Sequence, residues 1–121
     1  MIISDMKIKE IKKVNDLTII YLSGGIMGGI AGVKLTEKFE ELINEKRCQK
    51  IILDLKAVSW MNSSGLGIIT SLLTEAKKLN VQFKLAGVTE RIISLFMITK
   101  LLSVFDIYKT VEEAIESFEG E

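Results

Sequence analysis

The sequence predicts a single α/β domain with one mixed β-sheet, an N-terminal β-hairpin and about four helices. Short apolar runs, typical of strands, alternate with longer segments in which apolar residues recur every three or four positions, as in amphipathic helices. The length of 121 residues, with 48% hydrophobic and 26% charged residues, is typical of one globular domain. We therefore expect residues 1–121 to fold around one core.

The first predicted element is the β-hairpin. Ile and Val alternate with charged residues over Met6–Val14, the pair at positions 15 and 16 (Asn-Asp) favours a turn, and Leu17–Leu22 has the pattern of a second strand. The alternation slips between Ile8 and Ile11, which predicts a bulge in the first strand.

Further helices and strands follow the hairpin. After a glycine-rich stretch, a helix is predicted by the apolar positions Leu35, Phe39, Leu42 and Ile43. The nearly continuous apolar run Ile51–Leu55 predicts a central strand covered on both faces. A long helix then has its apolar residues at Leu66, Ile69, Leu72, Leu73, Ala76 and Leu79. Alternation over Val81–Leu85 predicts another strand, and a third helical stretch spans Glu90–Leu102.

The C-terminal part is predicted to add a short strand and a last helix. Apolar residues gather at Val104–Ile107, and Thr110 with Glu113 has the spacing of a capping box. One apolar stripe follows, made of Val111, Ala114, Ile115 and Phe118. The predicted order is therefore ββαβαβα with a final βα unit.

Charge and two rare residue types exclude several functions. Sixteen Lys and Arg balance sixteen Asp and Glu, so we expect no direct binding to nucleic acid. The sequence contains no His, which excludes Ser-His and Cys-His catalytic pairs and histidine metal sites, and we expect neither a metal nor a cofactor. Cys48 is interpreted as a structural thiol in a reducing compartment.

A cytoplasmic location without membrane contact is expected. Met1–Glu10 is polar and charged and lacks the apolar stretch of a signal peptide. Leu17–Val33 and Ala57–Thr74 are uncharged, but glycines and small polar residues interrupt them. Both fit a buried strand that a glycine turn joins to a helix.

Residues 56–67, between the central strand and the long helix, carry the most informative chemistry. A hydroxyl at a helix start can cap free amides, which is the simpler interpretation of Ser63 and Ser64. A phosphate placed there would instead meet backbone N–H groups and the positive end of the helix dipole. Gly65 and Gly67 leave little bulk nearby, so a partner could approach the backbone closely.

These residues carry a resemblance to a known family. Ile52-Leu53-Asp54-Leu55, followed by Asn62-Ser63-Ser64-Gly65-Leu66-Gly67, resembles the Asp-Ser-Ser-Gly-Leu-Gly region of bacterial anti-sigma factor antagonists, which are STAS domains. The similarity extends over nearly the whole chain, from Gly25-Ile26 at the end of the second strand to the tail at 104–114. It implies a single STAS-like domain.

The resemblance also implies a function. In this family the first hydroxyl after the acidic residue, here Ser63 and with less support Ser64, is phosphorylated by a serine kinase that is also the anti-sigma factor. The unphosphorylated antagonist binds the anti-sigma factor and frees the sigma factor. The phosphorylated antagonist is released until a protein phosphatase restores the unphosphorylated form. The residues expected to contact the partner are Asn62, Ser63, Ser64, Gly65, Leu66, Gly67, Ile93 and Met97.

The second part of that surface lies on the third helix. Apolar residues at 91–98 cover more of the helix than one core needs, so some of Ile93, Met97 and Ile98 should be exposed or in an interface. Burial in the core is the alternative. In the family this helix lies beside the phosphoserine helix, which suggests a shared docking face.

The chain departs from the family at Asn62, where Asp is usual. Asn keeps an acceptor oxygen but loses the negative charge, so phosphorylation is slower or absent if the Asp orients the kinase or the serine. The alternative function is an adaptor without a phosphoswitch, in a stressosome or a lipid transport complex. An enzyme that uses Asp54 and the serines is disfavoured, because no histidine base or phosphate-binding loop motif is present.

Overall fold

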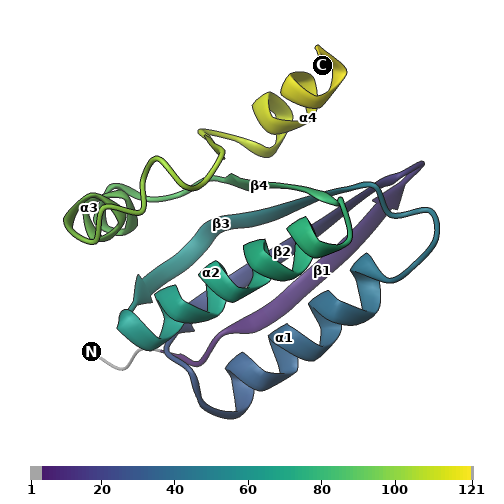
Figure 1. Cartoon of the computed structure of the whole chain (residues 1–121). Helices are drawn as coiled ribbons and strands as arrows, with labels where there is room; N and C mark the ends of the chain where they lie inside the picture. The colour runs from purple at the N-terminus through teal and green to yellow at the C-terminus, as the bar shows by residue number, and fades with distance from the viewer. Residues whose placement is uncertain (1–3, 121) are drawn as a thin grey trace.

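The computed structural model describes residues 4–120, which form one five-stranded mixed sheet with helices packed on its faces (Figure 1). The strand order is β1-β2-β3-β4-β5. β1 is antiparallel to β2, and the remaining neighbours are parallel. Residues 1–3 and 121, the ends of the predicted domain, lie outside the described residues.

Strands and helices occur in the order that the sequence predicts. The strands are β1 (Lys7–Val14), β2 (Leu17–Ile26), β3 (Lys50–Met61), β4 (Gln82–Ala86) and β5 (Ile107–Tyr108). The helices are α1 (Gly29–Ile43), α2 (Ser63–Lys78), α3 (Glu90–Ile98) and α4 (Val111–Glu119). The register of β1 against β2 shifts between Ile8 and Glu10, which confirms the predicted bulge in β1.

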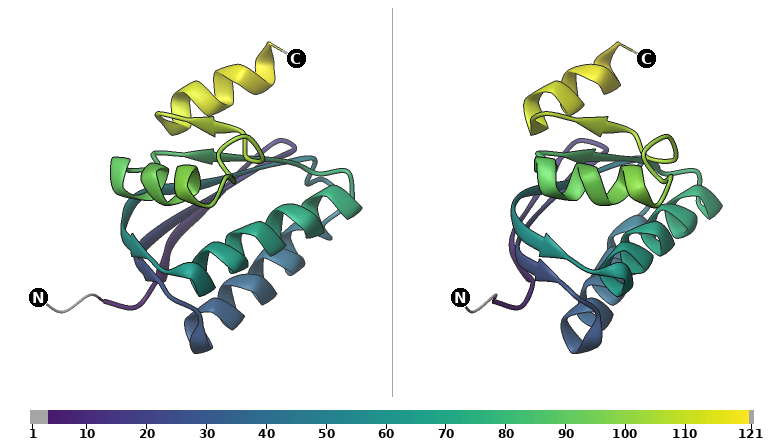
Figure 2. Two further views of the ribbon diagram at one scale, coloured as in Figure 1. Left: turned by 60° about the vertical axis from the view of Figure 1, so that its left-hand side comes forward. Right: turned by 90° about the vertical axis from the view of Figure 1, so that its left-hand side faces the viewer.

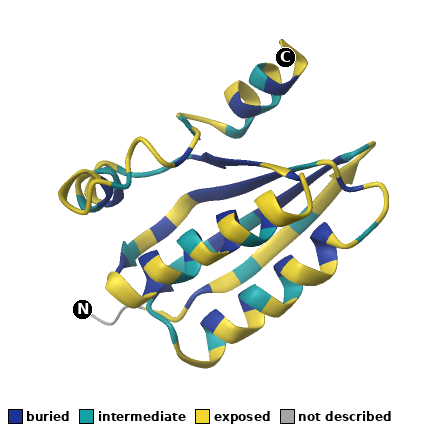
Figure 3. Cartoon of the chain, viewed as in Figure 1, coloured by how far each residue is buried: buried dark blue, intermediate teal, exposed yellow. Residues whose placement is uncertain are grey.

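The core has two parts, one on each face of the sheet (Figures 2 and 3). The larger cluster joins one sheet face to α1, α2 and α3. The smaller cluster joins the other face to α4 through Ala114 and Phe118, which pack with Leu17, Ile19, Ile52 and Ala86. β3 is the middle strand, and Ile51–Leu55 is buried throughout, as predicted for a strand covered on both faces.

Several element boundaries differ from the prediction. α1 begins at Gly29, inside the stretch predicted as a glycine turn, after the N-cap Gly28, which has φ 85°. Gly32 lets this helix lie close to Ile68 of α2. β3 continues beyond Leu55 to Met61, because this part pairs with the end of β2 through two register shifts. α3 ends at Ile98 and not at Leu102, since Lys100 takes a left-handed conformation with φ 62°.

The side chains of Cys48 and of the capping box at the start of α4 test two local predictions. Cys48 is buried, and burial raises the pKa of its thiol, as suits a structural residue. In the predicted capping box, Thr110 Oγ1 accepts a hydrogen bond from the Glu113 amide at 3.0 Å. The Glu113 carboxylate accepts a hydrogen bond from the Lys109 amide, so the second bond of the capping box is displaced by one residue from the Thr110 amide.

No helix within residues 4–120 has the length and apolar character needed to cross a bilayer.

Candidate functional site

The predicted site lies where β3 ends and α2 begins, and Asn62 connects the two. Asn62 Oδ1 accepts a hydrogen bond from the Gly65 amide at 2.8 Å, which makes Asn62 the N-cap of α2. Its backbone N–H donates to Ile26 O at 3.3 Å, and its Nδ2 donates to Met27 O at 3.5 Å. The start of α2 is thereby fixed to the end of β2. The prediction that a serine caps this helix is wrong.

Both serine hydroxyls are available at the surface. Ser63 and Ser64 are the first two residues of α2, and both are exposed. Their amides precede the first intrahelical bond, which Leu66 N–H donates to Asn62 O. The first turn contains no acidic residue, so an anion bound there meets the positive end of the helix without a like charge in that turn.

The residues that follow position the helix. Gly65 is buried, and a Cβ at this position would overlap Ile26 O, so only glycine allows α2 to lie against the end of β2. Leu66 is also buried and packs in the larger core cluster. Gly67 is exposed and has open space where a Cβ would lie. Among residues 62–67, the solvent-facing positions are therefore Ser63, Ser64 and Gly67.

The start of α1 forms a flank of this site that the sequence analysis missed. A Cβ at Gly28 would come within 3.3 Å of Ser64 Cβ, so the turn before α1 lies against the start of α2. On the first turns of α1, Val33 is 57% exposed and lines a hollow shared with Ile68 of α2. Ile30 is 77% exposed and lies on the other side of α1, beside residues 5–8. The available signal was the Gly28-Gly29 pair, which replaces the more polar residues common after the second strand in the family and so bears on partner contact.

Helix α3 presents apolar residues to solvent, as predicted. Ile92 and Phe96 are buried, and Ile93 is half-buried. Met97 is 60% exposed and Ile98 79% exposed, so the excess of apolar residues is confirmed. α3 and the start of α2 both lie at the end of the sheet where β3 finishes (Figures 1 and 2). A docking face shared by the two helices stays a prediction.

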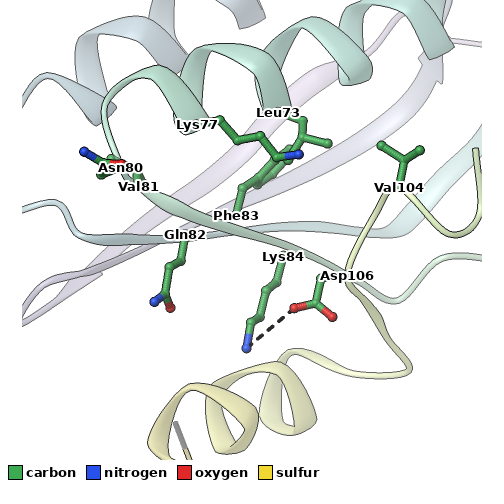
Figure 4. Close-up of a pocket in the computed structure, with 9 residues that line it drawn as sticks. All are labelled: Leu73, Lys77, Asn80, Val81, Gln82, Phe83, Lys84, Val104 and Asp106. Atoms are coloured by element: carbon green, nitrogen blue, oxygen red, sulfur yellow. Dashed lines mark ion pairs between the residues drawn. The ribbon is translucent and has the colours of Figure 1, made fainter.

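A separate cavity of about 450 Å³ lies by the start of β4, and two of the charged residues that line it, Lys84 and Asp106, have structural roles (Figure 4). The buried Lys84 donates a hydrogen bond to Ser117 Oγ at 2.7 Å and pairs with Asp106 at 3.8 Å. Its ammonium also lies 3.9 Å from the centre of the Phe118 ring. These contacts hold α4 and the segment before β5 against β4.

Comparison with known proteins identifies the family. Residues 8–114 match the model of the STAS domain. A protein of Thermotoga neapolitana, described as a homologue of a proposed anti-sigma factor antagonist, is 34% identical to this chain over 82 residues. The matched region covers 68% of this chain and 72% of that protein. Over 62 residues this chain is 39% identical to the anti-sigma-B factor antagonist of Bacillus subtilis, covering 51% of this chain and 57% of that protein.

A solved structure agrees with this result. The anti-sigma factor antagonist SpoIIAA in its unphosphorylated form superposes with a TM-score of 0.77 at 21% identity, covering 93% of this chain and 96% of that one. Its phosphorylated form gives a TM-score of 0.70. At this identity the superposition shows the fold alone. The chain belongs to the STAS domain family. Within that family it is a member of the anti-sigma factor antagonist group.

Proposed function

We propose that this protein binds an anti-sigma factor with serine kinase activity, and that this binding releases a sigma factor. The observation that carries the proposal is the pair of exposed serines at the N-terminus of α2, at the position where the family motif has its modified hydroxyl. The names of the two sequence relatives support the same role. The protein acts as a binding switch and performs no catalysis itself.

The modified residue in this proposal is Ser63. A phosphate on Ser63 adds about 1.5 to 2 negative charges beside amides that have no intrahelical partner. The neutral Asn62 at the cap does not repel the phosphate, as an Asp at the same position would. The helix therefore accepts the modification without loss of structure.

The same charge prevents docking. In the unphosphorylated protein the surface at the start of α2 combines small polar groups with the exposed apolar residue Val33 on the neighbouring helix α1. A partner that covers this surface must remove water from whatever it buries, and removal of water from a phosphate dianion has a high energetic cost. Phosphorylation thus releases the partner, and a protein phosphatase restores binding.

The experiment that tests the modification is phosphate mapping with purified kinase and ATP. Wild type should gain one phosphate on the peptide that contains Ser63, Ser63→Ala should gain none, and Ser64→Ala should behave as wild type. Ser71→Ala, an exposed serine on the same helix, is the matched control. Phosphate that persists on Ser63→Ala would contradict the assignment.

A second function is favoured by one observation, the neutral cap at Asn62. If the kinase needs a carboxylate at this position, the protein is a constitutive adaptor, as in a stressosome or a lipid transport complex. Asn62→Asp distinguishes the two functions, because Asp is as good an N-cap as Asn. Phosphorylation of Asn62→Asp but not of wild type would favour the adaptor.

A further inference from the structure

Helices α1 and α2 lie side by side, and a hollow of about 290 Å³ lies between them (Figures 1 and 2). Its lining comes from residues 29–40 of α1 and from Ile68 of α2. A Cβ at Gly32 would lie 2.5 Å from Ile68 Cδ1. The two helices can approach this closely because Gly32 has no side chain.

One end of the hollow adjoins the start of α2, where the exposed serines lie. Gly29 lines the hollow, and a Cβ on the preceding Gly28 would lie 3.3 Å from Ser64 Cβ. A specific interface usually covers about 800 Å² on each partner, which corresponds to a circular patch with a radius of about 16 Å. A partner that docks over Ser63 and covers such an area therefore extends over the hollow.

The part of the hollow near the serines has apolar walls. Val33 of α1 is 57% exposed, and Ile68 of α2 is half-buried. Both residues line the hollow, so each presents a branched side chain to it from one of the two helices. An apolar side chain that fills this space removes both from water and gains dispersion contacts with both.

The part of the hollow further along α1 is acidic. Its charged lining residues are Glu37 and Glu40, and both are exposed. Among residues 4–120 neither takes part in an ion pair, whereas their neighbour Glu41 pairs with Lys38 at 3.3 Å. Side chains three residues apart on a helix are neighbours, so the charges of Glu37 and Glu40 repel each other. A cation placed between them removes this repulsion.

We propose that this hollow selects the partner by receiving a segment of the anti-sigma factor kinase that combines an apolar side chain with an Arg or Lys. The apolar side chain packs between Val33 and Ile68, and the basic group pairs with Glu37 and Glu40. This inference rests on the proposed function, because the kinase reaches the hollow by docking over Ser63. A kinase with an acidic segment at this place is rejected, since carboxylates would then face carboxylates.

The basic contact is separate from the phosphate switch. Glu37 lies roughly 12 Å further along α1 than Gly29, at about 1.5 Å per residue. Exposed charges are largely screened from each other beyond about 8 Å at physiological ionic strength. A phosphate on Ser63 therefore has little effect on the pairing at Glu37 and Glu40. The state of Ser63 decides whether a kinase binds, and the hollow decides which kinase binds.

The test measures binding of the purified kinase at about 50 mM and about 300 mM salt, on either side of physiological ionic strength. Glu37→Gln/Glu40→Gln should weaken binding about fivefold at the lower salt, mainly through slower association, and should reduce the salt dependence of the affinity. The matched control Glu116→Gln/Glu119→Gln removes two charges from exposed positions on α4 and should bind as wild type does. Val33→Ser should weaken binding about equally at both salt concentrations, because its contact is apolar.

The outcomes separate this inference from the proposed function. If Glu37→Gln/Glu40→Gln binds as wild type does while Ser63→Glu still loses the kinase, the inference fails and the proposed function stands. An equal loss in the α4 control would show a general effect of net charge and would overturn the inference. A dimer of wild type that Val33→Ser dissociates would assign the hollow to a second copy and overturn it too. If wild type binds no kinase, both fail.

Discussion

Ser63 combines an exposed hydroxyl with the unpaired amides of a helix N-terminus, so a negative charge there should stabilise the free protein. We expect Ser63→Glu to raise the free energy of unfolding by about 0.3 to 1 kcal/mol, the usual gain for a charge at a helix end. Urea denaturation measures this change. Ser71→Glu, mid-helix and exposed, should give no such gain. A destabilised Ser63→Glu would contradict the expected tolerance of a phosphate.

Asp54 should give the protein a distinctive dependence of stability on pH. Burial raises the pKa of Asp54 above its ordinary value of 3.8, and the hydrogen bond from the Lys56 amide opposes this only in part. In the pH window just above that value, the folded state binds more protons at this residue than the unfolded state does. Stability contributed by Asp54 is therefore present at low pH and is lost as pH rises through the raised pKa.

The variant Asp54→Asn does not titrate and so removes this loss. We expect Asp54→Asn to gain stability relative to wild type as pH rises from about 3 to about 7, with a plateau above the raised pKa. Urea denaturation of both proteins across this range, without added ligand, measures the difference. A wild type that gains on the variant as pH rises would show that the native fold favours the charged carboxylate.

At the scale of single elements, the position of α2 depends on one glycine. A Cβ at Gly65 would overlap Ile26 O, whereas a Cβ at Gly67, in the same helix, meets open space. We expect Gly65→Ala to lose about 2 kcal/mol or more, because the helix must move away from β2. Gly67→Ala should gain up to about 1 kcal/mol from helix propensity. Chemical denaturation of the pair tests this, and equal effects would contradict the close approach.

The sequence predicts the elements better than their ends, for a physical reason. Periodicity reports which side chains face the core, and it correctly places the strands and helices in order. The end of β3 depends on pairing with β2, and the first turns of α1 lie against α2 at Ser64 and Ile68. Such tertiary contacts leave no periodic signal, so β3 is longer and α1 starts earlier than predicted.

The candidate site is predictable to a similar extent. The motif places Ser63 and Ser64 at the start of a helix, and the structure confirms their position. The sequence does not reveal that Asn62 is the cap or that the turn at Gly28 lies against Ser64, because both depend on how the ends of β2, α1 and α2 meet. The cap also explains how an Asn can replace the family Asp without loss of the local fold.

For the molecule as a whole, exposed apolar residues lie on the first turns of α1 and on α3, and both lie toward the end of the sheet where α2 begins. We expect Ile30→Ser and Met97→Ser each to weaken partner binding about fivefold or more, as truncation of an interface contact commonly does. Val14→Ser, which changes an exposed apolar residue on β1, is the matched control. Calorimetry with the purified partner measures the affinities. Equal affinity of all three variants would remove α1 and α3 from the docking surface.

The most direct test of the partner switch is affinity capture from the source cells, with wild type, Ser63→Ala, Ser63→Glu and Ser71→Glu as baits. Mass spectrometry identifies what each bait retains, and the captured kinase is then purified for binding measurements. The account predicts that wild type, Ser63→Ala and Ser71→Glu retain an anti-sigma factor kinase and that Ser63→Glu loses it while folded. Equal retention of that kinase by Ser63→Glu would contradict the switch and favour a constitutive adaptor.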